Sequence, residues 1–283
     1  MSSLVAAEQC TLCGGTRSEP ALGGVLRRCR SCAFQWTAAE LASPEELYDE
    51  SYYKSESYRR YFALAAQWRF EATRRLRWLL SAVRPATLVE AGPAGGFFLK
   101  AASARGISVE GVEVSELAAR YARERLGVPV RRGMFESISL AAPVQAVCAF
   151  HVLEHVPDPR VFLSAAREML LPGGWLALEV PNISSAAAHR YGASWVDLAP
   201  RYHHWHFSPE SLARLVTEAG FAVVHADTIF ASHYLRPSRW PSRWGMASHW
   251  RCLRTTGSLR TTHPHLGDYL RLLARRQRPG GRA

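Results

Sequence analysis

Four cysteines near the N-terminus have the spacing of a tetrahedral zinc site. They form two C-x-x-C pairs separated by fifteen residues: Cys10 and Cys13, then Cys29 and Cys32. Each pair presents two thiolates from one tight turn, and two such turns fill all four positions of a closed, structural Zn²⁺ site. The N-terminal residues show no secretion signal, which disfavours disulfides, and a thiol redox pair would not need a second C-x-x-C. We therefore expect structural zinc rather than catalytic zinc.

Histidines in two short stretches have the chemistry for proton transfer. One stretch is "HVLEH", from His151 to His155, and the other is "RYHHWHF", from Arg201 to Phe207. A neutral imidazole near its unperturbed pKa accepts a proton at pH 7. The three neighbouring histidines of the second stretch also suggest a metal site. A purely structural role in shaping the loop stays open for either stretch.

A cluster of small residues after an apolar run indicates a cofactor loop. It is not a triphosphate-binding loop, because Phe97 and Phe98 stand where Lys and Ser or Thr are needed. It also fails the dinucleotide fingerprint, since Ala94 and Phe97 replace two glycines and Pro93 removes a backbone N–H. An acid followed by small residues at alternate positions suits a cofactor whose cationic amino-acid end lies against the chain: Glu90, Gly92, Ala94 and Gly96.

The elements that must position these residues alternate between strand and helix. Apolar runs predict strands at 87–90, 109–114, 128–131, 146–150, 175–180 and 222–229. Helical patterns predict helices at 58–83, 97–104, 116–126 and 209–219, and a further helix that begins at Pro159. Ser115, Asp158 and Ser208 are suitable N-caps. For 267–277 we favour a final strand over a basic amphipathic helix. This order predicts a mostly parallel sheet covered on both faces, with ligands at the carboxyl ends of its strands.

Composition sets the broad class of the protein. The chain has 283 residues, 48% of them hydrophobic, which is enough for one large domain and a small second module. No window resembles a membrane span or signal peptide, so we expect a cytoplasmic location. The formal net charge of +11 favours anionic partners, among them an anionic small molecule, nucleic acid or a membrane surface.

The cofactor loop resembles motif I of the class I S-adenosylmethionine-dependent methyltransferases, with Ala94 replacing the middle glycine. Glu113 in "VEGVEVS" stands where this family has the acid that accepts both ribose hydroxyls. "RRGMF", ending at Phe135, matches the adenine-facing turn, with Met134 in place of a frequent acid. Two further segments, 149–182 and 203–221, resemble the later strands and helices of the family.

The resemblance implies a Rossmann-like class I methyltransferase fold, a mostly parallel seven-stranded α/β sheet with helices on both faces, preceded by a small zinc ribbon. It implies that His151 borders the methionine end of the cofactor, and it favours His203 and His206 as catalytic bases. The S-adenosylmethionine site that it implies consists of nine residues: Glu90, Gly92, Ala94, Gly96, Glu113, Val114, Met134, Phe135 and His151.

We divide the chain into a zinc ribbon (1–40), a Tyr-rich linker and helix acting as a lid (41–86), a cofactor-binding domain (87–230) and a basic aromatic segment with a final strand (231–283). The ribbon resembles that of methyltransferases acting on sugars and other small molecules. We therefore expect O-, C- or N-methylation of a small molecule, such as a sugar or natural product. An RNA methyltransferase, or a non-catalytic binding protein with a basic tail that contacts a membrane or partner, are the alternatives.

Overall fold

The computed structural model describes residues 9–39, 44–48, 61–230, 260–261 and 266–278. The Tyr-rich stretch at 49–60 and the Trp- and Arg-rich stretch at 231–259 lie outside these residues. The expected tyrosine lid at Tyr52 and Tyr53, and the basic surface expected of the second stretch, are therefore not described. Within the described residues no helix is long and apolar enough to cross a membrane.

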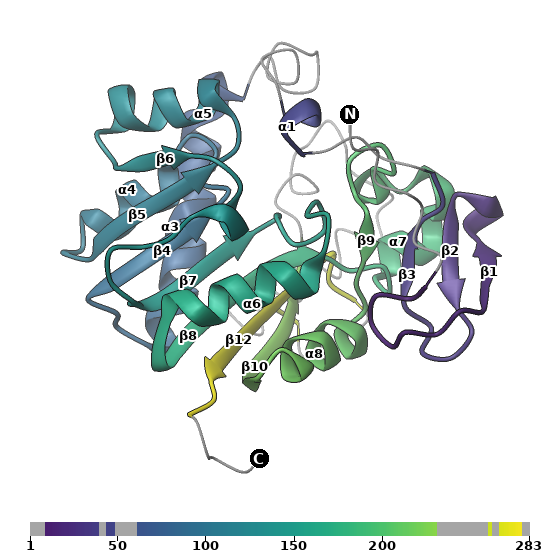
Figure 1. The fold of residues 1–283 in the computed structure, drawn as a ribbon. Coiled ribbons are helices and arrows are strands. Elements are labelled where there is room, and N and C mark those ends of the chain that lie inside the picture. The colour runs from purple at the N-terminus through teal and green to yellow at the C-terminus, as the bar shows by residue number, and fades with distance from the viewer. Residues whose placement is uncertain (1–8, 40–43, 49–60, 231–259, 262–265, 279–283) are drawn as a thin grey trace.

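One twisted sheet forms the centre of the molecule (Figure 1). Its strands lie in the order β11-β10-β12-β8-β7-β4-β5-β6. Strands β4 to β8 are parallel to one another, whereas β12 is antiparallel to both β8 and β10. The strands are β4 (Thr87–Ala91), β5 (Ser108–Glu113), β6 (Val130–Arg132), β7 (Val144–Phe150), β8 (Leu170–Pro181), β10 (Phe221–Ile229), β11 (Arg260–Thr261) and β12 (Tyr269–Arg276). The predicted seven-stranded, mostly parallel sheet is confirmed, with the two-residue β11 added at one edge.

Helices cover both faces of this sheet. On one face α3 (Ala65–Ala82), α4 (Phe97–Ser103) and α5 (Glu116–Tyr121) pack around Leu79, Phe98 and Leu273. On the other face α6 (Pro159–Met169) and α8 (Pro209–Glu218) pack around Phe162 and Leu212. Within the described ranges the remaining short helices are α1 (Pro44–Leu47), α7 (Ala186–Tyr191), the 3-10 turns Leu22–Gly24, Phe62–Leu64, Phe135–Ser137, Gly192–Ser194 and Val196–Leu198, and the π turn Ala122–Leu126.

Two of the three expected N-caps form, and the third does not. The Asp158 carboxylate accepts from the backbone N–H of Arg160 at 2.7 Å, and Ser208 makes a capping box with Ser211. The Ser115 hydroxyl makes no cap, and the Glu113 carboxylate accepts from the backbone N–H of Ser115 at 2.9 Å. Side-chain hydrogen bonding to the start of α5 therefore comes from the preceding strand.

Strand β8 is longer than expected. The "LPGG" residues form part of the strand rather than a turn before it, so β8 begins at Leu170 and not at Trp175. The pairing of β7 with β8 shifts register between Val144 and Ala146, which accommodates the extra residues opposite β7. Gly173, with φ of 78°, lies in this irregular part of the strand.

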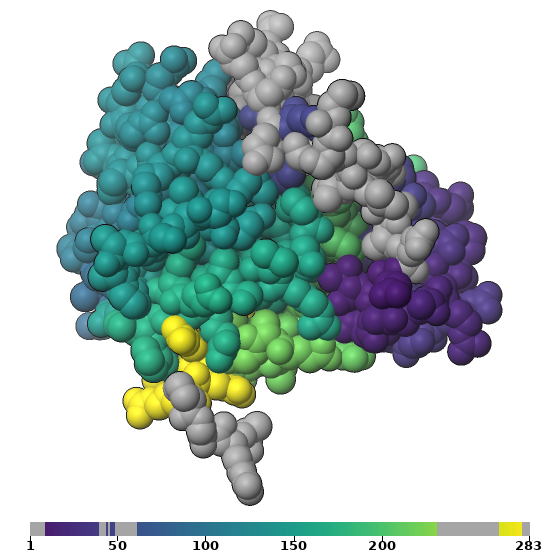
Figure 2. Space-filling model, viewed as in Figure 1, coloured from purple at the N-terminus to yellow at the C-terminus, as the bar shows by residue number. Residues whose placement is uncertain are grey.

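The N-terminal ribbon shares its sheet with a strand from the middle of the chain. Strands β1 (Ser18–Ala21), β2 (Leu26–Cys29) and β3 (Gln35–Thr37) form an antiparallel sheet whose fourth strand is β9 (Trp205–His206). Figure 2 shows the ribbon directly against the segment that contains α8. The Arg160 side chain on α6 donates to the backbone carbonyls of Thr11 and Leu12 beside the cysteines. The ribbon is therefore built into the large domain.

Candidate functional site

The loop between β4 and α4 takes a left-handed backbone at three alternate residues. Gly92, Ala94 and Gly96 have φ of 60°, 47° and 79°. A Cβ at Gly92 would lie 2.6 Å from Val152, and one at Gly96 would lie 2.8 Å from the Cβ of Ala122. Both positions therefore require glycine for φ and for space. Ala94 adopts the same region, and its N–H donates to the Glu113 carboxylate at 2.8 Å.

Two buried acids flank this loop and have different surroundings. Glu113 accepts from the backbone N–H groups of Ala94 and Ser115, which fixes the carboxylate beside the loop. Burial raises the pKa of Glu113, and these backbone donors lower it in part. Glu90 is 4% exposed, and its Oε2 has no hydrogen-bond partner among the described residues. Burial raises the pKa of Glu90 to about 8, because the charge of Arg75 opposes the shift only in part.

Tyr61 covers the outer side of the loop. Its hydroxyl accepts from the backbone N–H of Gly95 at 3.5 Å, and its ring stacks on Trp68 at 4.7 Å. A Cβ at Gly95 would lie 3.3 Å from this ring, so the loop and the tyrosine are in close contact. Tyr61 lies in the predicted helix 58–83, but the α-helix begins only at Ala65, and no sequence pattern indicated the contact of Tyr61 with the loop.

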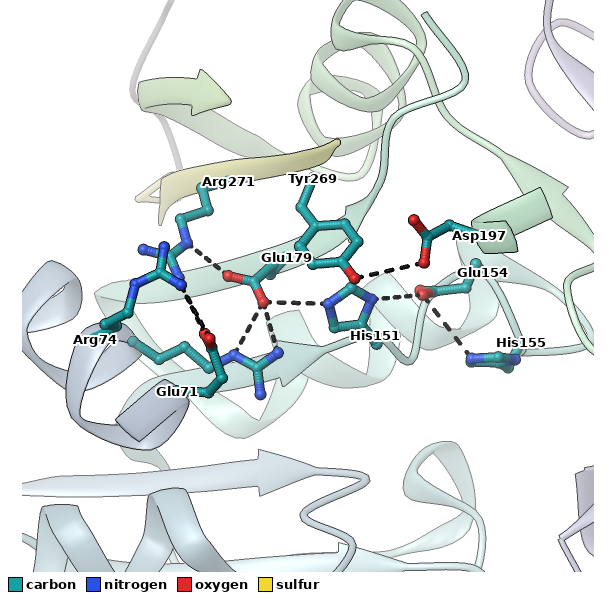
Figure 3. Close-up of polar contacts among 10 residues, drawn as sticks. Glu71, Arg74, His151, Glu154, His155, Glu179, Asp197, Tyr269 and Arg271 are labelled. Atoms are coloured by element: carbon teal, nitrogen blue, oxygen red, sulfur yellow. Dashed lines mark hydrogen bonds and ion pairs between the residues drawn. The ribbon is translucent and has the colours of Figure 1, made fainter. Parts of the chain in front are cut away.

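His151 follows β7 and lies between two carboxylates. Its Nδ1 is 3.3 Å from Glu154 and its Nε2 is 3.2 Å from Glu179 (Figure 3). Because both ring nitrogens face acceptors, the geometry favours the doubly protonated imidazolium. The hydrogen bonds and charges of these carboxylates outweigh burial and raise the pKa of His151 to about 9. Its φ of 57° places the residue in a strained backbone conformation.

A buried ion-pair network fixes Glu179 beside His151. Arg75 of α3 and Arg271 of β12 each approach the Glu179 carboxylate at 2.6 Å. These charges, together with His151, hold the pKa of Glu179 well below its usual range despite its burial. Sequence patterns did not predict this network. Its signal is an acid and an arginine that interrupt the apolar runs "LALEV" and "YLRLLA" at buried positions.

Tyr269 and Asp197 complete the polar cluster at this edge of the sheet. The Tyr269 ring meets the His151 ring edge-on at 4.4 Å, and its hydroxyl donates to Asp197 Oδ1 at 3.4 Å (Figure 3). Burial raises the pKa of Asp197 to about 6, although His151 and Tyr269 act in the opposite direction. Sequence patterns did not indicate either residue, because both lie in segments where the spacing of apolar residues is least regular.

The two histidines expected to act as bases lie in different surroundings. His206 is on β9, and its Nε2 is 3.0 Å from the hydroxyl of Thr37 in the ribbon. The His203 ring lies 4.6 Å from that of His155. Burial and neighbouring histidines lower the pKa of His203 well below its usual range, and burial lowers that of His206 to about 3.

The three-histidine metal set raised by the sequence does not appear among the described residues. A different group, Glu154, His155 and His203, brings its ligand-type atoms within 4.8 Å of one another. His155 Nδ1 in this group already lies 2.7 Å from the hydroxyl of Tyr48 and 2.9 Å from the carbonyl of Tyr202.

The expected adenine-side residues lie beyond β5 and β6. Val114 follows β5 directly and is partly buried, while Met134 precedes the turn that starts at Phe135. Phe135 is 5% exposed and packs on Phe162 at 4.8 Å. Met134 and Val114 therefore lie next to the strand ends where a ligand would bind, whereas Phe135 belongs to the core.

The four N-terminal cysteines meet in one place. Their sulfurs lie within 4.8 Å of one another, with 3.5 Å between Cys10 and Cys32 and between Cys13 and Cys29. Backbone N–H groups around Cys29 lower the pKa of its thiol to about 7, against the effect of burial. A Cβ at Gly15 would lie 3.2 Å from the Cys13 sulfur, so the chain turns closely around the cluster. This arrangement fits a zinc ribbon.

The sheet order, with antiparallel β12 between β8 and β10, and the acid-led glycine loop after β4 define a class I S-adenosylmethionine-dependent methyltransferase. The sequence comparison agrees with this class. The chain belongs to the methyltransferase domain family, whose model matches residues 58–226.

Curated relatives and solved structures of the same class are similar to the chain. It is 30% identical over 161 residues to a ubiquinone biosynthesis O-methyltransferase of Thiobacillus denitrificans, covering 52% of this chain and 69% of that protein. It is 28% identical over 148 residues to the protein of the same name in Nitrosomonas europaea, covering 47% and 63%.

Two solved structures show the same fold at low identity. A methyltransferase of Thermotoga maritima, described as a possible histamine N-methyltransferase, has a TM-score of 0.56 at 20% identity, covering 78% of this chain and 95% of that chain. The N-methyltransferase NodS of Bradyrhizobium japonicum, in complex with S-adenosyl-L-homocysteine, has a TM-score of 0.50 at 17% identity, covering 74% and 86%.

Proposed function

We propose that this enzyme transfers the methyl group of S-adenosylmethionine to a hydroxyl oxygen of a small-molecule acceptor. The observation that carries the proposal is the 30% identity to an O-methyltransferase across 69% of that relative. Ubiquinone bears methoxyl groups on a quinone ring, and the reduced form of a quinone is a phenol, so phenols are the first acceptors to consider, followed by sugars and natural products. The Trp- and Arg-rich segment that suggested an RNA substrate lies outside the described residues.

The loop after β4 has the features needed to hold the cofactor. Glu113, fixed by two backbone donors, retains lone pairs for the ribose hydroxyls. Glu90 supplies a buried carboxylate oxygen without a partner among the described residues, which suits the ammonium group of the methionine end. The close approach at Gly92 and Gly96 leaves no room for other side chains, and Ala94 continues the same turn.

The other expected cofactor residues take positions around this loop. Val114 and Met134 are proposed to contact the adenine, with Phe135 supporting the turn from the core. The backbone of His151, whose N–H donates to the Glu179 carbonyl at 2.7 Å, is proposed to border the methionine end. Tyr61 supports the proposed covering role of residues 41–86, because it contacts Gly95 in the loop.

When bound, S-adenosylmethionine supplies an activated methyl group on a positively charged sulfur. The chain's own residues then have to position the acceptor, exclude water and remove the hydroxyl proton. The network of Arg75, Glu179, Arg271 and His151 holds the strand ends around this position through buried ion pairs. His203 and His206 stay candidate bases from the family resemblance, and their lowered pKa values make each a weak base.

The cysteine cluster is proposed to bind one structural Zn²⁺. Four sulfurs within 4.8 Å of one another, in turns shaped by Gly14 and Gly15, match a closed tetrahedral site. Because the same core contains Trp36, Trp205 and Phe207, the metal would stabilise the junction of ribbon and large domain.

The experiment that tests the proposed function combines calorimetry with product analysis. Wild-type protein should bind S-adenosylmethionine at micromolar concentration and produce a methyl ether from at least one member of a panel of phenols, sugars and amines. Glu113→Ala should lose the binding, whereas Glu124→Ala, an exposed residue on the helix after β5, should keep it. Methylation confined to amines would contradict the O-methyltransferase assignment, and absence of cofactor binding would contradict the proposed cofactor site.

A further inference from the structure

The segment between β8 and β9 places one carboxylate at the polar edge of the sheet. Asp197 lies in the 3-10 turn Val196–Leu198, between the buried side chains of Trp195 and Leu198. These two side chains pack with Leu26 of the ribbon in one buried cluster, which fixes the turn against the ribbon. The carboxylate therefore projects from a short turn that is fixed by the buried side chains of Trp195 and Leu198.

Tyr269 fixes the direction of this carboxylate. Its hydroxyl donates to Asp197 Oδ1, and its ring rests edge-on against the imidazole of His151. Because His151 follows β7 at the carboxyl end of the parallel strands, the contact brings Asp197 to the edge where ligands bind in this class of sheet. Figure 3 shows Asp197, Tyr269, His151 and Glu154 grouped at this edge.

The neighbouring histidines and Glu154 each have contacts or burial that limit them as bases. Both ring nitrogens of His151 face carboxylates, so the ring has no free lone pair to accept a proton. His155 Nδ1 lies within hydrogen-bond distance of Tyr48 and Tyr202. Burial and the neighbouring histidines hold the pKa of His203 well below its usual range, which makes it a weak base. Glu154 is 1% exposed, and its carboxylate lies 3.3 Å from Nδ1 of His151.

We propose that Asp197 and Tyr269 form the acceptor-hydroxyl subsite, with Asp197 removing the hydroxyl proton during methyl transfer. The inference rests on the proposed O-methyltransferase function. The acceptor oxygen forms a bond to the methyl carbon, the carbon–sulfur bond of the donor breaks to leave a neutral thioether, and the proton passes to the carboxylate. Tyr269 orients Asp197 and is a positioning residue.

The surroundings of Asp197 suit this role. The groups that act on it include the imidazolium of His151, the Tyr269 hydroxyl and the carboxylate of Glu154. Burial raises its pKa to about 6, which keeps the group ionised at neutral pH while making it a stronger base than an exposed aspartate. The activity should therefore fall as the pH drops through about 6.

The test compares pH profiles of wild type, Asp197→Asn and Tyr269→Phe with the hydroxyl acceptor found in the panel. In Asp197→Asn we expect kcat to fall about 100- to 10,000-fold and the acid limb near pH 6 to disappear, while affinity for S-adenosylmethionine changes less than about threefold. In Tyr269→Phe the acid limb of the pH profile should remain but shift to higher pH, because the lost phenol hydrogen bond lowers the pKa of Asp197 in the wild type. Glu124→Gln is the surface control.

Other results for these variants would refute either the subsite or the proposed function, and they can be told apart. An Asp197→Asn enzyme with wild-type kcat and an unchanged limb would refute the subsite while leaving the O-methyltransferase function intact. Loss of S-adenosylmethionine affinity in that variant would show that Asp197 supports the cofactor side instead. Loss of the limb in His203→Ala but not in Asp197→Asn would return the base to the histidine. A wild-type enzyme that binds the cofactor but methylates no hydroxyl would refute the proposed function and this inference together.

Discussion

Replacing Glu90 with glutamine should stabilise the ligand-free enzyme in a strongly pH-dependent way. Burial raises the pKa of Glu90 from 4.5 to about 8. Between these values the folded chain retains a proton that the unfolded chain has released, so the free energy of unfolding falls with rising pH. The decrease is about 1.36 kcal/mol per pH unit from this group. It amounts to about 3 kcal/mol at pH 7 and to roughly 4 to 5 kcal/mol above pH 8.

Urea unfolding of Glu90→Gln and wild type at a series of pH values measures this effect. At about pH 5 the carboxylic acid is protonated in the folded wild type and nearly isosteric with the amide, so the two proteins should differ by about 1 kcal/mol or less. At about pH 8.5 the variant should be more stable by several kcal/mol. Glu124→Gln, at an exposed position, should show no such growth of the difference with pH.

The same variant should bind S-adenosylmethionine about 10- to 100-fold more weakly, because it loses a charge-assisted contact to the ammonium group. In wild type the affinity should fall below pH 8, where binding has to displace the proton from Glu90. A stability difference that is constant across the pH range would refute the reasoning, since it would mean that Glu90 is ionised and satisfied before the cofactor binds.

Three further predictions concern the loop and the ribbon. Gly96→Ala should lower the free energy of unfolding by about 1 to 3 kcal/mol, measured by urea titration, because its Cβ would lie 2.8 Å from that of Ala122 at a φ of 79°. Cys13→Ser should lower the zinc content from one ion per chain, measured by mass spectrometry, and decrease the melting temperature; an unchanged zinc content would contradict the four-thiolate site. His206→Ala should lower the melting temperature by losing the contact with Thr37, while the pH profile of kcat stays as in wild type.

Local patterns predicted most of the fold. The alternation of apolar strands with capped helices predicted β4 to β8, β10 and the choice of strand over helix for β12, because each pattern reflects burial of one segment against the common sheet. The ends of β8 and the absent cap at Ser115 were not predicted. The end of β8 depends on the register of its pairing with β7, which no local pattern contains. At Ser115 the residue type suits a cap, but the hydroxyl makes no cap hydrogen bond.

The candidate site was predictable only where its residues lie close together in sequence. The loop from Glu90 to Gly96 is one contiguous motif, and Glu113 follows at the end of the next strand. The pairs Arg75 with Glu179 and Arg271 with Glu179 are 104 and 92 residues apart, so no local spacing indicates them. Asp197 and Tyr269 likewise meet only after β12 has inserted beside β8.

The strand shared between ribbon and large domain sets an order of events during synthesis. Thr37 and its partner His206 are separated by 169 residues. At a translation rate of about 5 to 20 residues per second, roughly 10 to 30 s pass between synthesis of the two. During that interval Phe34 and Trp36 lack the β9 residues on which they pack in the finished protein. Strands β1 to β3 are therefore made well before the strand that completes their sheet, which gives the growing chain a period in which early metal capture, or a chaperone, would protect that apolar surface.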